Sequence, residues 1–332
     1  MNLGLISIII HKYSSTNNYS YFAAFKHHFM KKITGILFGI TVLVFNTFAN
    51  VLPVVPISLA LKPAINSKVT YVISDYGSTI TSMNGLDMHS VANTTTEYTL
   101  DYIGEISGLN CFKVVLNSIK IHTEIFGMSV DINSDSIITD TSKLNSNANM
   151  IYKRLTNKPF TIFITKSGNI NSTSGTKEIY QKAFIKTELN SLAPIYKNML
   201  NERLLTSGLT KLFAYLPNKP VEVNEKWVKN DSLALTGMHL NLVTTYSLDK
   251  LNTRLADISF NSVIQYEGPN QTTLGIASTV KVSGEINGSC EVNTSTGMLN
   301  SFSSSVTTDT KMKMRETEVP MKSLSKTTIF IK

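Results

Sequence analysis

Residues 256–266 read Ala-Asp-Ile-Ser-Phe-Asn-Ser-Val-Ile-Gln-Tyr, a stretch in which apolar and polar side chains alternate. Successive side chains of a β-strand point to opposite faces, so this alternation predicts a strand with one buried face. Similar segments recur along the chain, separated by clusters of Gly, Asn, Ser and Asp that are typical of short loops. They span residues 68–75, 94–103, 112–121, 128–132, 160–164, 241–248, 273–286, 298–312 and 322–331.

The period changes in residues 176–215, where Ile179, Ala183 and Phe184 fall at helical spacing. Pro194 is placed to begin a second helix, and a third short helix is expected near the end of the region. We expect this helical insert to cover one face of the sheet, and a lid over a ligand is the alternative. The predicted fold is mainly β (α+β), a large twisted antiparallel sheet or half-open barrel with a central helical insert.

A weak internal repeat suggests two related β halves. Residues 104–108 read Gly-Glu-Ile-Ser-Gly and residues 284–288 read Gly-Glu-Ile-Asn-Gly, each at a predicted turn and each shortly before a cysteine, Cys111 or Cys290. Chance similarity is the alternative. In an oxidising compartment the two cysteines could form a disulfide, which would contribute about 4–5 kcal/mol by restricting the unfolded chain. Two separate buried thiols are the other interpretation.

Residues 30–49 have the order of a secretory signal peptide. A positive start at Met30, Lys31 and Lys32 precedes an uncharged, mostly apolar stretch, and small residues place the cleavage site between Ala49 and Asn50. The stretch is shorter than the ~20 apolar residues of a membrane span. An uncleaved N-terminal anchor is the alternative.

The signal peptide divides the chain into four parts. Residues 1–29 precede a complete signal peptide, so we interpret them as a mis-annotated upstream extension. Residues 50–64 contain three prolines and form an extended lead-in, and residues 65–332 form the β-rich domain, with its insert at about 176–215. No cysteine stands directly after the cleavage site, and no second long apolar run occurs. We therefore expect a protein of the periplasm or the exterior, with neither lipid anchor nor integral membrane span.

The net charge of +8 does not indicate a nucleic-acid partner. Lys12, Lys26, Lys31 and Lys32 lie in the leader, and the remaining basic residues are scattered. Catalytic, cofactor and metal sites are not predicted either. His89, His122 and His239 have no Gly-x-Ser-x-Gly nucleophile motif to serve, and the aspartates near residue 135 lack EF-hand spacing.

Residues 215–227 read Tyr-Leu-Pro-Asn-Lys-Pro-Val-Glu-Val-Asn-Glu-Lys-Trp. Pro217 and Pro220 end the helical region and force an extended chain. Asn224 accepts the left-handed turn conformation better than most residues other than glycine. Trp227 is the only tryptophan, and we expect it to pack into the core with its indole N–H bonded to a carbonyl. Ligand stacking is the alternative role.

This segment resembles a family of uncharacterised exported β-rich proteins of Gram-negative bacteria, a domain of unknown function with the motif Tyr/Phe-x-Pro-x-Lys-Pro-Val-x-Val-Gly-x-x-Trp. Asn224 stands where that family favours glycine. The resemblance covers most of residues 65–331 and implies strands around a central helical stretch, without any assigned activity. The matching residues are Pro217, Lys219, Pro220, Val221, Val223 and Trp227.

Together these features indicate an exported cell-envelope protein without catalytic function. A curved sheet with helices across one side can hold an apolar molecule, so we expect it to bind a lipid, another apolar ligand or an envelope protein. A structural or surface-adhesion module is one alternative. The other is a hydrolase whose residues converge from distant strands.

Overall fold

The computed structural model describes residues 56–83, 85–125, 127–136, 144–184, 205–206, 208–235, 238–271, 277–314 and 317–332. The chain divides into two compact units, Met1–Val54 and Val55–Lys332, and every described residue lies in the second. The predicted signal peptide, the upstream extension and the predicted helix at Pro194 therefore lie outside the described residues. Within the described part, none of the helices combines the length and apolar character needed to cross a bilayer.

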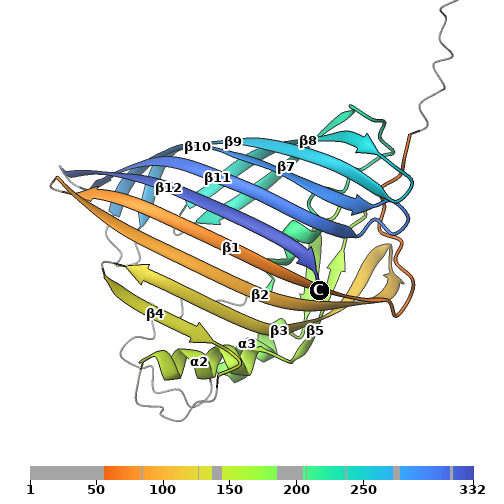
Figure 1. Cartoon of the computed structure of the whole chain (residues 1–332), viewed down its shortest axis with the longest axis horizontal. Coiled ribbons are helices and arrows are strands. Elements are labelled where there is room, and N and C mark those ends of the chain that lie inside the picture. The colour runs from red at the N-terminus through yellow and green to blue at the C-terminus, as the bar shows by residue number, and fades with distance from the viewer. Residues whose placement is uncertain are drawn as a thin grey trace, which may run out of the picture. The chain divides into compact units, whose positions relative to one another are not determined.

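Twelve strands form one antiparallel sheet that is not closed (Figure 1). The sheet order is β6-β5-β3-β2-β1-β12-β11-β10-β9-β8-β7, and β4 pairs with the free half of β3. Figure 1 shows the sheet curling so that β7 and β8 pass behind β11 and β12. The strands are β1 (Lys68–Met83), β2 (Leu86–Ile106), β3 (Leu109–Ile125), β4 (Met128–Asn133), β5 (Pro159–Ile164), β6 (Ile170–Ser174), β7 (Lys226–Leu235), β8 (Met238–Leu251), β9 (Leu255–Gln271), β10 (Ala277–Asn293), β11 (Leu299–Met314) and β12 (Thr317–Ile331).

The predicted mainly β fold, with one large antiparallel sheet, is confirmed. Strands that follow each other along the chain mostly pair as hairpins, and the pairing of β1 with β12 joins the first strands to the last. The first strands run further than the sequence predicts, because apolar alternation stops before the pairing does. Beyond Asp75, β1 continues through a segment rich in Gly, Ser and Thr that still pairs with both neighbours.

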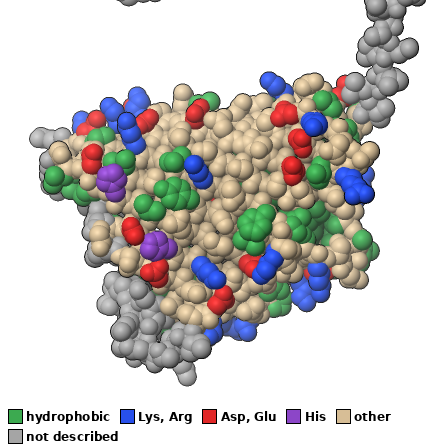
Figure 2. Space-filling model, in the orientation of Figure 1, with side chains coloured by type: hydrophobic (Ala, Val, Ile, Leu, Met, Phe, Trp, Pro, Cys, Tyr) green, Lys and Arg blue, Asp and Glu red, His purple; other side chains and the backbone are tan. Residues whose placement is uncertain are grey.

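One face of the sheet carries the buried side chains, among them Tyr71, Tyr98, Tyr246 and Phe260. We call it the inner face. The other face, the outer face, is polar on β11, where Ser301, Ser303, Ser305 and Thr307 alternate with inner-face residues. On the side of the molecule turned to the viewer in Figure 2, most of the surface is uncharged polar side chains and backbone, charged side chains are scattered over it, and hydrophobic ones form small separate groups. The sheet thus has one apolar side.

Two α-helices and one 3-10 helix are described: α2 (Leu144–Leu155), α3 (Thr176–Ala183) and η3 (Leu209–Leu212). The predicted insert contains α3 and η3. The sequence prediction missed α2, whose many Asn and Ser residues resemble a loop. Its buried residues Ala148, Ile151, Tyr152 and Leu155 nevertheless follow helical spacing.

Two further predictions are wrong. The first strand predicted after the insert spans residues 241–248, but β7 already begins at Lys226. A turn was expected at residues 284–288, yet these lie in the middle of β10 and pair with both β9 and β11. Gly284 is needed there for close packing, since a Cβ would lie 2.2 Å from the carbonyl oxygen of Thr307. The first copy does form a turn, with positive φ at Ser107 (52°) and Gly108 (80°).

Candidate functional site

Two separate apolar clusters lie on the inner face. The first, which we call the covered cluster, includes Tyr71, Tyr98, Phe112 and Ile162 from the strands. The segment 205–221 packs over it and contributes buried residues, as does the lead-in with Leu59 and Leu61. The residues from the covering segment are Leu205, Leu209, Leu212, Phe213, Tyr215, Leu216 and Val221.

The second cluster, which we call the strand cluster, consists only of strand residues. Its buried members come from β8, β9 and β10, and partly buried side chains of β9, β10 and β11 pack against them. None of its members among the described residues comes from a helix or a loop. The buried residues are Leu240, Leu242, Ile264, Val280 and Val282, and the partly buried ones are Tyr266, Ile286, Val306 and Met312.

A row of aromatic rings crosses the inner face at the edge of the covered cluster. Trp227 stacks on Tyr246 with ring centroids 5.6 Å apart, Tyr246 contacts Phe260 at 5.5 Å, and Phe260 stacks on Phe302 at 5.3 Å. Gly288 on β10 leaves room for this row, because a Cβ there would lie 2.3 Å from the ring of Phe260. The row thus connects β7, β8, β9 and β11.

A row of buried polar residues comes next along the strands, between the aromatic row and the strand cluster. Lys229 pairs with Thr244, and Thr244 pairs with Ser262. All three residues are less than a tenth exposed. The Lys229 ammonium donates to the carbonyl oxygens of Ser167 (2.5 Å) and Ala214 (2.7 Å). It therefore holds the β5–β6 turn and the covering segment against β7.

Two buried donors at this boundary have no hydrogen-bond partner among the described residues, Trp227 Nε1 and Ser262 Oγ. The prediction that the indole N–H bonds a carbonyl is therefore wrong, although Trp227 does pack into the core. The sequence alone shows that Ser262 is a polar residue at a buried position, because it interrupts the apolar alternation of Ile258, Phe260 and Ile264. Its pairing with Thr244 could not be read from that pattern.

A second set of polar contacts, in addition to those of Lys229, attaches the covering segment to the inner face. The Lys211 ammonium of η3 lies 2.7 Å from Asp75 Oδ1 on β1 and 2.9 Å from Thr327 Oγ1 on β12. The Thr327 hydroxyl donates to the same carboxylate. These bonds tie the insert to the two strands that join the halves of the sheet.

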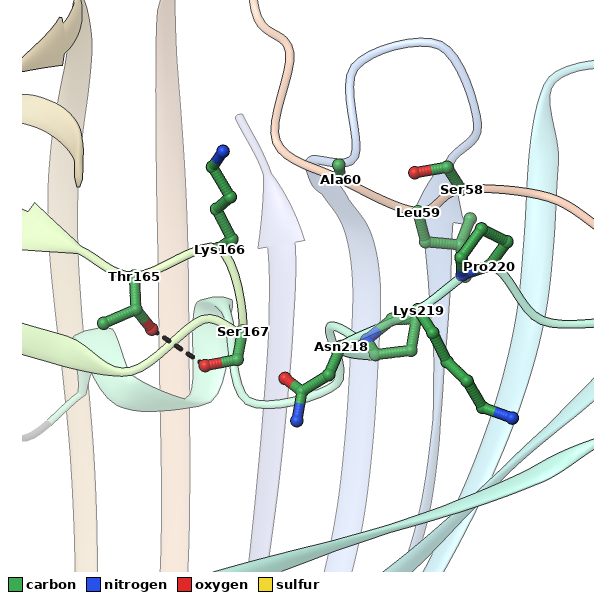
Figure 3. A pocket seen from close by; sticks show the side chains of 10 residues that line it. Ser58, Leu59, Ala60, Thr165, Lys166, Ser167, Asn218, Lys219 and Pro220 are labelled. Atoms are coloured by element: carbon green, nitrogen blue, oxygen red, sulfur yellow. Dashed lines mark hydrogen bonds between the residues drawn. The ribbon is translucent and has the colours of Figure 1, made fainter. Parts of the chain in front are cut away.

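The Pro-rich motif borders a pocket of about 430 Å³ (Figure 3). Pro217, Lys219 and Pro220 line one side, and Thr165 and Ser167 line another, their hydroxyls 2.9 Å apart. The remaining lining residues are Ser58, Leu59, Ala60, Lys166 and Asn218.

The motif itself mostly makes structural contacts. Buried Val221 exchanges backbone hydrogen bonds with Ile57 of the lead-in, at 2.8 and 3.0 Å, and Val223 packs against the covered cluster. Asn224 has the expected positive φ of 69°. The ammonium of Lys219 pairs with Glu225 at 2.7 Å and holds the pKa of that carboxyl below its ordinary value. The motif thus connects the lead-in, the insert and the sheet.

The two cysteines are free and buried. Cys111 lies on β3 and Cys290 on β10, and four strands of the sheet stand between them. In this structure the two thiols are separate, and no bond joins them. Burial raises the pKa of both thiols, which makes them poor nucleophiles.

Among the histidine side chains that the structure describes, His122 lies between two carboxylates. His122 Nδ1 lies 2.7 Å from Asp131 Oδ1, and its Nε2 lies 3.3 Å from Glu124 Oε1. The hydrogen bond to Asp131, followed by the one to Glu124, raises the pKa of His122 on the exposed surface. His89 is exposed on β2, and the side chain of His239 lies outside what is described. Within the described ranges, no group of three or more His, Cys, Asp or Glu side chains could hold a metal ion.

Solved structures give only weak likenesses. Lipovitellin, from a study of its lipid–protein interactions, is 11% identical with a TM-score of 0.41, covering 82% of this chain and 25% of that one. An outer membrane channel from Pseudomonas putida F1 is 8% identical with a TM-score of 0.23, covering 82% and 98%. Pseudomonas aeruginosa OccK2 (OpdF) is 7% identical with a TM-score of 0.21, covering 80% and 98%. The chain spans about a quarter of lipovitellin, and none of these TM-scores supports a functional inference.

Sequence comparison identifies the family. No curated protein matches the chain. A family model described as a family of unknown function (DUF6263) matches residues 109–299, from the first residue of β3 to the first residue of β11. The match covers more than half of the sequence, including the insert, the Pro-rich motif and most of the strand cluster. The chain belongs to this family of unknown function, DUF6263.

Proposed function

We infer that this protein is an exported, non-catalytic binding protein that holds a lipid or another apolar molecule on the inner face of its open sheet. The observation that carries this proposal is the strand cluster. Its side chains are apolar, they line the inner face of β8–β11, and among the described residues they are matched by no helix or loop.

Neighbouring residues on β9 distinguish the two faces of the sheet. Ile264 on the inner face is 2% exposed, whereas Val263 on the outer face is 64% exposed. The export part of the proposal rests on the signal-peptide pattern of residues 30–49. On the same pattern we propose that the protein lies in the periplasm or outside the cell.

His122 argues against the hydrolase alternative. Both of its ring nitrogens face carboxylate oxygens, of Asp131 and Glu124. Neither nitrogen is left to accept a proton from a serine hydroxyl, which a hydrolase base must do. The binding function therefore fits the described geometry better.

Native mass spectrometry of the protein purified from its own host tests the proposal. We expect a bound species whose added mass disappears after organic extraction and returns on incubation with a lipid extract. Two variants locate the site, because Ile264→Asn changes the inner face while Val263→Asn changes the outer face of the same strand. A protein that remains apo before and after incubation would contradict the proposed function.

A further inference from the structure

We propose that a basic pocket at the C-terminal ends of α2 and α3 binds a phosphate group, carried either by a small ester or by a lipid head group. The pocket has a volume of about 680 Å³, within the range of about 300–1,000 Å³ that is usual for small-molecule sites. Figure 1 shows α2 and α3 side by side below β4. The lining residues come from these helices and from the segments that follow β4 and α2, so the basic pocket is separate from the strand cluster.

The lining of the basic pocket is polar throughout and mostly positive. All eight lining residues are polar or charged, and four of them are basic while one is acidic. The acidic one is Asp135, and a carboxylate oxygen of it lies 3.9 Å from the ammonium of Lys120, which balances part of its charge. The pocket therefore suits an anion and not an apolar molecule. The basic residues are Lys153, Arg154, Lys158 and Lys182.

The backbone around the basic pocket is anchored to β3. Asn157 ends α2 with a positive φ of 58°, and its N–H donates to the carbonyl oxygen of Leu116 at 2.8 Å. This turn places Lys158 directly before β5. The buried hydroxyl of Ser134 accepts a hydrogen bond from the backbone N–H of Ile119 at 3.0 Å. Both lining segments are thus held to the same strand.

Two of the basic residues have a structural role that needs no ligand. Arg154 Nη1 donates to the carbonyl oxygen of Ala183, the last residue of α3, at 3.2 Å. The Lys153 ammonium donates to the carbonyl oxygen of Ser136 at 3.3 Å. Cations near the C-terminal end of a helix commonly bond free carbonyls and offset the helix dipole. Since both acceptors are neutral, these contacts leave the two positive charges unbalanced.

The other two basic residues, Lys158 and Lys182, have no such role. Within the described part of the chain, neither ammonium has a hydrogen-bond or ion-pair partner, and both side chains are exposed. One residue lies in the turn after α2 and the other in the last turn of α3, yet both line the same pocket. Cations from separate elements therefore meet at one concave site, where their fields add.

The number of charges favours phosphate over a carboxylate. A phosphate monoester carries a charge of about −1.5 to −2 at pH 7 and three strong acceptor oxygens, whereas a carboxylate carries one charge and two oxygens. Each lysine ammonium has three donors on a long, flexible stem. Lys158 and Lys182 can thus donate to a phosphate group inside the pocket from two sides, while the charges of Lys153 and Arg154 attract the same group.

Calorimetric titration of the purified full chain with glycerol 3-phosphate tests the proposal. At low ionic strength we expect this probe to bind about tenfold more tightly than acetate, and glycerol should not bind. The affinity should fall severalfold as ionic strength rises from about 0.01 M to about 0.15 M, because the Debye length shortens from about 30 Å to about 8 Å.

Variants locate the site on the protein. Lys158→Gln and Lys182→Gln should each weaken binding of glycerol 3-phosphate about threefold to fivefold, and the double variant about tenfold or more. Lys177→Gln is the matched control, because Lys177 is exposed on the same helix α3 but does not line the pocket. It removes the same charge and should leave the affinity unchanged. Thermal melting of each variant verifies folding.

Vesicle flotation distinguishes the two sources of phosphate. Vesicles of phosphatidylcholine with and without phosphatidic acid differ in an exposed phosphate monoester. Retention on the phosphatidic acid vesicles that the double variant loses and Lys177→Gln keeps would identify a lipid head group. Binding of glycerol 3-phosphate without such retention would identify a small ester. Both results support a phosphate site.

Three results would overturn the proposal. The first is a lack of binding to both glycerol 3-phosphate and phosphatidic acid vesicles at low ionic strength. The second is equal affinity for acetate and glycerol 3-phosphate. The third is equal weakening by Lys177→Gln and Lys182→Gln, which would mean that net charge alone attracts the anion. None of these results bears on the strand cluster, so the apolar-ligand function would stand or fall on its own test.

Discussion

The covered cluster and the strand cluster arise from the same alternating strands, yet they differ in what lies over them. Phe213, Tyr215 and Leu216 of the covering segment are fully buried on the first cluster. The second contains only strand residues among the described part of the chain. Alternation thus produces two buried apolar clusters on the inner face, and the described covering segment packs on one of them. The strand cluster is the part of the inner face where we propose that an apolar ligand binds.

Hydrogen bonds from polar side chains hold the covering segment in place on the inner face. Lys229 fixes the carbonyls of Ser167 and Ala214 at the aromatic row, and Lys211 fixes η3 to Asp75 near the middle of the sheet. Tyr215 adds a hydrogen bond to the carbonyl oxygen of Gly297 at 2.9 Å. These contacts hold the covering segment on the covered cluster. Mutating the residues that make them should therefore loosen the segment without changing the strand cluster.

The largest expected effect is that of Phe213→Ala in the covered cluster. Phe213 is fully buried, and its ring centroid lies 5.5 Å from that of Phe112. Loss of the ring should lower the free energy of unfolding by about 3–5 kcal/mol in urea denaturation. Leu240→Ala in the strand cluster should lower it by about 2 kcal/mol, because the leucine side chain has fewer apolar atoms to lose than the phenylalanine ring. Equal losses at the two sites would remove the distinction between the clusters.

Lys229→Met should have the next largest effect. It leaves the carbonyls of Ser167 and Ala214 without their ammonium donor, so we expect a loss of about 2–3 kcal/mol in the free energy of unfolding. Lys226→Met, at an exposed position on the same strand, is the control and should be nearly neutral. Comparable losses in both variants would show that Lys229 does not fasten the covering segment.

Gly288→Ala tests the aromatic row with a smaller expected loss of about 1–3 kcal/mol from overpacking. The added Cβ would lie 2.3 Å from the Phe260 ring and 2.5 Å from the carbonyl oxygen of Ser303. Phe260→Leu in the same chain should recover part of the loss, since it removes one of the two clashes. A neutral Gly288→Ala, measured by thermal melting, would mean that the row does not need the glycine.

The smallest effect concerns the outer face, which belongs to neither cluster. Asp131→Asn should lower the raised pKa of His122 toward its ordinary value, as followed by NMR titration. Because the folded-state pKa is raised, the pair stabilises the fold below the unfolded pKa, and this contribution is lost as the pH rises through the folded pKa. Ligand binding should leave this titration unchanged, and a ligand-dependent shift would place the ligand on the wrong face.

Local patterns predicted the sheet but not its division into two clusters. The alternation of residues 256–266 identifies β9, and the Asn at position 224 identifies a left-handed turn. The strand β7 was missed because Lys229, Asn230 and Asp231 make it read as a polar loop, although Lys229 is buried. Burial of an ammonium depends on carbonyl acceptors from residues 167 and 214, which no local pattern reveals.

The candidate site depends on contacts between distant segments in the same way. The unpartnered state of Trp227 Nε1 and Ser262 Oγ follows from the register of β7, β8 and β9 and from the position of the insert. The cysteine interpretation likewise needed the sheet order, because only the order shows four strands between Cys111 and Cys290.

Calorimetric titration of the delipidated protein with dodecanoic acid tests most directly whether the strand cluster binds an apolar ligand. Wild type and Val263→Asn should bind with equal affinity, and Ile264→Asn, one residue away on the inner face, should bind at least about tenfold more weakly. Equal binding by all three proteins, or equal weakening by both substitutions, would contradict a binding site on the inner face.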